Sequence, residues 1–219
     1  MDTGRPLTQA PRGMVASPHP LASRAGVEIL EAGGSAVDAA IAAAAVLCVV
    51  YPHMTSVGGD AFWLIHDARR GGVRFLNGGG RAAAGATLEW FASRGLGEIP
   101  LHGIVPATLT VPGAVDSWCE AQAGHGRLTL ARDLAPAIGY AREGFEVTER
   151  LAQWTGEAAE MLAASAAAAA IFLPGGRPPQ AGERLDNPDL ARTLEAIGTG
   201  GRGAFYEGEV AREIVRHSR

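Results

Sequence analysis

Hydrophobic residues recur along this chain mostly at helical spacing. Apolar side chains at positions 21, 25, 29 and 30 share one helix face, so a helix is expected from Pro20 to Ala32, ending at Gly33 and Gly34. Further helices are predicted over 87–93, 114–123, 130–142, 148–170, 189–197 and 207–217. We expect an interruption of 148–170 at Gly156, a kink or later start caused by Pro136, and a glycine-rich turn over 198–203.

A second helix is expected after Ser35, because Ser35 and Asp38 have the spacing of an N-cap pair. The residues that follow, up to Val50, are almost all small and apolar. A helix that is apolar on every side must be buried. Its alanines allow close packing, so Leu at Ala40, Ala43 or Ala44 is expected to overpack the interior.

Strand-like residues are confined to one short region. The runs Phe62–Asp67 and Val73–Asn77 contain aromatic and β-branched residues and are joined by Ala-Arg-Arg-Gly-Gly, which predicts a β-hairpin at about 61–78. We therefore predict an α+β fold that is mostly helical. Because two strands alone are only marginally stable, partner strands are expected from elsewhere.

Proline and glycine suggest where the chain divides. Residues 1–13 are predicted to be a loose N-terminal arm, residues 14–219 to be one domain, and residues 174–183 to be a Pro/Gly loop at a possible subdomain break. The N-terminus lacks the apolar core of a signal peptide, and the longest apolar run, 39–51, is shorter than the ~18 to 20 residues of a membrane span. A cytoplasmic protein without a membrane partner is expected.

Composition excludes several classes of activity. The formal net charge is −4, which predicts no nucleic-acid partner. All 19 basic residues are arginine, so a Schiff-base lysine, a lysine-bound pyridoxal phosphate and a P-loop lysine are all excluded. The histidines and the two cysteines show no metal-ligand spacing, and neither a metal nor another cofactor is expected. Four acids have no spacing that pairs them for catalysis, and capping or surface roles are predicted for them: Asp38, Asp60, Asp67 and Glu143.

The candidate binding residue is Arg81, which follows the second strand and three glycines. Glycine allows positive φ and close approach of other groups, and a guanidinium fork binds a carboxylate. A surface arginine is the plain alternative. Gly78–Ala83 also matches the loosest dinucleotide fingerprint, G-x-G-x-x-A, but no helix follows directly and no second strand with a terminal acid comes later.

Six short motifs resemble, in order and approximate spacing, the large subunit of the γ-glutamyltranspeptidases and their acylase-like relatives. They are Met14-Val-Ala-Ser-Pro-His-Pro-Leu-Ala-Ser, Gly33-Gly-Ser-Ala-Val-Asp-Ala-Ala, Pro52-His followed by Val57-Gly-Gly, Val111-Pro-Gly, Ala141-Arg-Glu-Gly-Phe and Phe205-Tyr-Glu-Gly. The resemblance extends over about residues 13 to 217. Each motif alone is weak, and the ordered set is strong.

This resemblance implies an N-terminal-nucleophile (Ntn) hydrolase, in which two chains cut from one precursor build an αββα sandwich. In such enzymes a threonine freed by self-cleavage takes the acyl group of a γ-glutamyl or related amide and passes it to water or to an amine. The threonine would lie outside this chain, in the missing C-terminal half that is its implied partner. This chain alone therefore holds no catalytic residue and is predicted to be inactive.

The resemblance also implies that Arg81 grips the substrate carboxylate. Its setting, Gly-Gly-Gly-Arg81-Ala-Ala, departs from the family's Arg-Glu-x-Ala-Pro and is closer to the Gly-Arg-Ala-Pro of the acylase-like branch, whose proline it lacks. A noncatalytic truncated remnant or a helical binding module remains the alternative. A large exposed apolar face on the hairpin and on the 39–50 helix would favour a fragment that awaits its other half.

Overall fold

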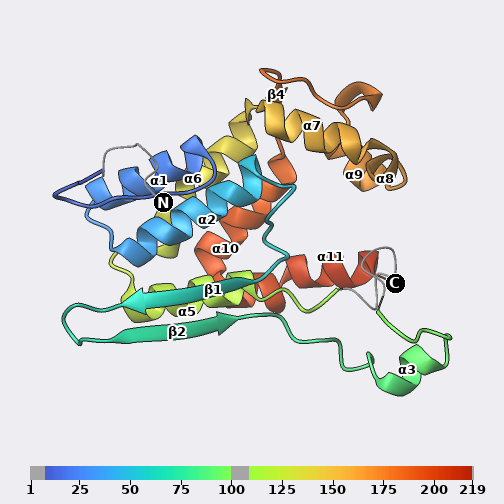
Figure 1. Ribbon diagram of the computed structural model, residues 1–219, viewed down its shortest axis with the longest axis horizontal. Coiled ribbons are helices and arrows are strands. Elements are labelled where there is room, and N and C mark those ends of the chain that lie inside the picture. Colours follow the sequence, from blue (N-terminus) through green and yellow to red (C-terminus); the bar gives the residue numbers. More distant parts are fainter. Residues whose placement is uncertain (1–7, 100–108, 219) are drawn as a thin grey trace, which may run out of the picture.

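The computed structural model describes residues 8–99 and 109–218, so the predicted arm and the segment before residue 109 lie partly outside the described residues. Three helices pack around one buried helix, α2, and a β-hairpin lies along the side opposite α7 (Figure 1). The α+β class is confirmed. The helices are α1 (Pro20–Glu31), α2 (Ala36–Val50), α3 (Leu88–Ala92), α5 (Ala114–His125), α6 (Leu130–Glu143), α7 (Glu149–Glu157), α8 (Ala159–Ala163), α9 (Ala166–Phe172), α10 (Pro188–Tyr206) and α11 (Glu209–His217).

Helix α2 is the centre of the core, as its composition predicts. It packs against α1, α5 and α6, and most of its residues are buried. The predicted cap is a full capping box: Ser35 Oγ accepts from the backbone N–H of Asp38, and Asp38 Oδ2 accepts from that of Ser35 at 2.6 Å. Ala43 is buried, but Ala40 is exposed, so the expectation of overpacking at Ala40 is wrong.

The hairpin pairs β1 (Ala61–His66) antiparallel with β2 (Val73–Gly78), and Ala61 lies opposite Gly78. Its inner face packs toward the core and α5. Its outer face carries four large apolar side chains that are 63 to 78% exposed: Phe62, Leu64, Val73 and Phe75. The hairpin thus has the exposed apolar face expected of a fragment, whereas the 39–50 helix does not, because α2 is buried.

A second pairing was not predicted. Strand β3 (Phe145–Glu146) pairs antiparallel with β4 (Arg184–Leu185), and Val147 N donates to Glu183 O at 2.8 Å. Strands of two residues are too short to show alternation in the sequence, so only the path of the chain reveals them. The predicted break over 174–183 stays a prediction.

The long helical region after Thr148 divides at other places than expected. Gly156 lies inside α7, and the interruptions fall at Ala158 and at Ala164–Ser165. Ser165 Oγ accepts from Ala168 N, so a side-chain cap starts α9 in the middle of the alanine tract. The prediction of an interruption at Gly156 is therefore wrong. Glycine is tolerated within a helix, whereas the side-chain cap at Ser165 starts a new helix.

Two other boundaries are corrected. Helix α6 begins at Leu130, capped by Thr129, and continues through Pro136, so a later start is wrong. Helix α5 runs to His125, two residues beyond the predicted end.

The expected glycine-rich turn narrows to one residue. Gly201 interrupts the helical conformation of α10 with φ 55° and ψ −143°. Glycine adopts such a positive φ readily, so a single residue is enough to change the direction of the chain. Within 8–99 and 109–218, no helix is both long and apolar enough to cross a bilayer.

Candidate substrate-binding site

Arg81 lies three residues after the end of β2, in a loop whose backbone is held by hydrogen bonds. Its carbonyl accepts from Val111 N at 2.9 Å, and Ala82 forms an isolated antiparallel bridge with Thr110. The side chain is exposed, and no carboxylate of the described residues lies within ion-pair distance of it. The site therefore has an anchored backbone and a guanidinium that is open to a ligand.

The glycines before Arg81 are used for close backbone packing. A Cβ on Gly80 would lie 1.9 Å from Val111 O, and a Cβ on Gly78 would lie 2.4 Å from Ser117 Cβ. Across the contact, a Cβ on Gly113 would lie 2.2 Å from Gly78 O. Only glycine fits these places. The dinucleotide alternative is wrong, because these glycines pack on their own chain and the strands around them form an antiparallel hairpin.

Asp60, the residue directly before β1, reaches this glycine segment with its side chain. Its Oδ1 accepts from Gly80 N at 2.7 Å, and Asn77 Oδ1 accepts from Gly79 N at 2.9 Å. Next to it, Gly59 O accepts from both Gly113 N and Ala114 N. The sequence predicted only a capping or surface role for Asp60. It could not show the contact with Gly80, because the two residues are twenty positions apart along the chain.

The end of α10 secures the loop that contacts Arg81. The Tyr206 hydroxyl donates to Pro112 O at 2.7 Å and accepts from Asp116 N at 3.1 Å. Burial raises the pKa of this phenol. Arg202 Nε lies 2.7 Å from Asp116 Oδ1, and its guanidinium is 5.1 Å from the centre of the Tyr206 ring. Two of the quoted motifs, Phe-Tyr-Glu-Gly and Val-Pro-Gly, are thus in direct contact.

The hairpin is attached to α5 through a buried serine. Trp63 Nε1 donates to Ser117 Oγ at 3.0 Å, and Ser117 Oγ donates to Ala114 O at 2.7 Å. These bonds link the inner face of β1 to the start of the helix that Gly59 caps. The strand end that bears Arg81 is therefore held by β1, by the 110–113 segment and by α5.

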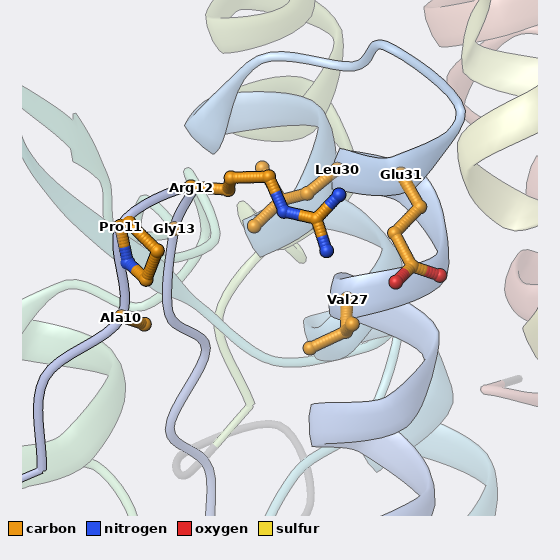
Figure 2. Close-up of a pocket in the computed structure, with 7 residues that line it drawn as sticks. All are labelled: Ala10, Pro11, Arg12, Gly13, Val27, Leu30 and Glu31. Atoms are coloured by element: carbon orange, nitrogen blue, oxygen red, sulfur yellow. The ribbon is translucent and has the colours of Figure 1, made fainter.

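A separate cavity of about 420 Å³ lies between the N-terminal arm and α1 (Figure 2). Among the described residues that line it, Arg12 and Glu31 carry the charges, and none belongs to the Arg81 cluster. Among the described residues no group of three or more His, Cys, Asp or Glu gathers as metal ligands do. The Arg81 loop therefore remains the candidate substrate-binding site.

Comparison with known proteins identifies the family of the chain. A sequence profile described as gamma-glutamyltranspeptidase matches residues 22–219. The chain is 47% identical over 204 residues to the glutathione hydrolase-like YwrD proenzyme of Bacillus subtilis (strain 168), covering 93% of this chain and 38% of that protein. It is 41% identical over 209 residues to the oxamate amidohydrolase proenzyme of Klebsiella pneumoniae, covering 93% and 39%.

Solved structures show the same relationship. The γ-glutamyltranspeptidase of Helicobacter pylori superposes with a TM-score of 0.88 at 33% identity, covering 95% of this chain and 60% of that one. The cephalosporin acylase of Bacillus halodurans gives 0.87 at 39% identity, covering 96% and 40%. The chain spans about two fifths of the length of the curated relatives, and corresponds to their N-terminal part. This chain belongs to the γ-glutamyltranspeptidase family of Ntn-hydrolases.

Proposed function

We propose that this chain is the N-terminal part of a precursor that hydrolyses or transfers the acyl group of an amide through a threonine outside the chain. The observation that carries the proposal is Arg81, an arginine without an ion-pair partner among the described residues, on a backbone fixed by Val111. A guanidinium held in this way suits bidentate binding of a substrate carboxylate.

The names of the relatives support a donor of this kind. They refer to glutathione, oxamate and cephalosporin, and each of these molecules contains an amide bond. All three also carry a carboxylate, which is the group that Arg81 would bind. The proposed donor is therefore a γ-glutamyl amide or a related carboxylate-bearing acyl amide.

The proposed partner is the rest of the same precursor. The outer face of the hairpin exposes Phe62, Leu64, Val73 and Phe75, and an apolar sheet face of this kind is normally covered. A second sheet layer from the remaining part would cover it and complete the sandwich. The proposed location is cytoplasmic, supported by Cys48 and Cys119, both free thiols in the described structure.

Expression of the complete precursor tests the proposal. We expect two chains by intact mass, with threonine first in the smaller one, and hydrolysis of a γ-glutamyl anilide by the processed protein. The 219-residue chain alone should not exceed a heat-killed control in this assay. A precursor that stays uncleaved and inactive would instead favour the remnant or binding-module alternative.

A further inference from the structure

We propose that Asp60 is the positioning residue of this site: its carboxylate holds the strand end that carries Arg81 and so sets the affinity for a carboxylate-bearing donor. The inference rests on the proposed function, because Asp60 acts through Arg81. It assigns Asp60 a structural contact with the backbone and no contact with the substrate.

The contact joins the two ends of the hairpin. Asp60 comes directly before β1, and Gly80 comes two residues after the end of β2. The distance from Asp60 Oδ1 to Gly80 N is 2.7 Å, which is short for an N–H···O bond and typical of one with a charged acceptor. The bond extends the pairing of Ala61 with Gly78 beyond the last ladder residues.

The bond matters because glycine leaves the backbone free to move. Three successive glycines lose more conformational entropy on ordering than residues with side chains, so external contacts must hold them. Gly79 N is held by Asn77 of the same strand, whereas Gly80 N is held by Asp60 from the other strand. Asp60 therefore fixes the Gly79–Gly80 peptide, one residue before Arg81.

The residues that follow this peptide are fixed by Val111. A Cβ on Gly80 would lie 1.9 Å from Val111 O, and Val111 N donates to Arg81 O. The segment from Gly80 to Arg81 is thus held between Asp60 on one side and Val111 on the other. Removal of the Asp60 carboxylate leaves only the contact with Val111, and the direction of the Arg81 side chain becomes less well defined.

Kinetics of Asp60 variants of the complete, processed precursor test the inference. Asp60→Ala should raise KM for a γ-glutamyl anilide about 5- to 30-fold and change kcat little, as expected when one charge-assisted hydrogen bond is lost. Asp60→Asn keeps an acceptor oxygen and should return KM to within about threefold of wild type. The matched control is Asp67→Ala, which removes a carboxylate that accepts from Arg69 N and Arg70 N at the turn of the same hairpin. Its KM should not change.

A double-mutant cycle separates this inference from the proposed function. If Asp60 acts through Arg81, Asp60→Ala should have no further effect on KM in an Arg81→Ala background. An additive effect, an Asp60→Asn variant as impaired as Asp60→Ala, or an unchanged KM in Asp60→Ala would overturn the inference. An unchanged KM in Arg81→Ala alone would overturn the carboxylate-binding role of Arg81 itself, and the inference with it.

Discussion

Asp133 on α6 faces Asp38 on α2, and both carboxyl groups are fully buried. Asp38 Oδ2 accepts from Ser35 N and Arg127 N, but Asp38 Oδ1 and both oxygens of Asp133 have no donor among the described residues. Two ionised carboxylates cannot donate to each other, so a proton on Asp133 supplies the missing hydrogen bond. Burial, and next the negative charge of Asp38, raise the pKa of Asp133 to about 7, opposed by the nearby Arg132.

This pair predicts stability that depends on pH. The pKa of Asp133 is about 7 in the folded protein and near its ordinary value of 3.8 when unfolded. Below 3.8 both states are protonated. As the pH rises toward 7, the unfolded state loses the proton first, so the free energy of unfolding falls, by on the order of 3 kcal/mol.

Denaturant unfolding of the precursor between pH 4 and pH 8 measures this effect. Asp133→Asn, which cannot ionise, should remove most of the decrease. Asp189→Asn, a control at an exposed carboxylate, should retain it. A wild-type profile that runs parallel to that of Asp133→Asn over this range would contradict a proton on Asp133.

Arg81→Ala in the complete enzyme should raise KM for a γ-glutamyl anilide by about 30- to 150-fold, because a bidentate charged contact is worth ~2 to 3 kcal/mol. Arg81→Lys should recover only part of the affinity, since an ammonium group does not reproduce the planar fork. Arg69→Ala, at the exposed turn of the same hairpin, is the matched control and should leave KM unchanged. Steady-state kinetics of the three variants decide the matter.

Tyr206→Phe should destabilise the protein by about 1 to 2 kcal/mol, because Pro112 O and Asp116 N both lose their partner. The loop that contacts Arg81 should loosen as a consequence, and hydrogen exchange at Val111 N should become faster. Tyr140→Phe is a suitable control, since the Tyr140 hydroxyl makes no hydrogen bond within the described structure. If the melting temperatures of the two variants fell equally, the Tyr206 hydroxyl would not be holding the 110–113 loop.

Gly80→Ala should impair folding or processing of the precursor. Its Cβ would lie 1.9 Å from Val111 O, a backbone atom that cannot move without displacing the Arg81 pairing. Gly124→Ala is the contrasting variant: Gly124 lies within α5, with no atom within 4 Å of its added Cβ. There alanine should stabilise by about 0.5 to 1 kcal/mol. Melting temperatures that change alike would refute the packing argument.

Local patterns in the sequence predicted much of this fold. The helix from Pro20, the capping box of Ser35 and Asp38 and the hairpin at 61–78 were expected, and the structure confirms them. These features depend on residues only a few positions apart, through periodicity, caps and turns. The order of short motifs was likewise enough to place the chain in its family, and the position of Arg81 at a strand end could be read directly.

Other features depend on the tertiary structure alone. Asp60 contacts Gly80 over twenty residues, Asp38 meets Asp133, and Tyr206 reaches Pro112 over ninety-four. No local rule specifies such pairs, because each requires two helices or strand ends to be brought together by packing of the core. A carboxylate or hydroxyl has the same sequence signature whether it faces solvent or a buried partner, so the sequence identified these residues as polar and only the fold showed what each of them holds.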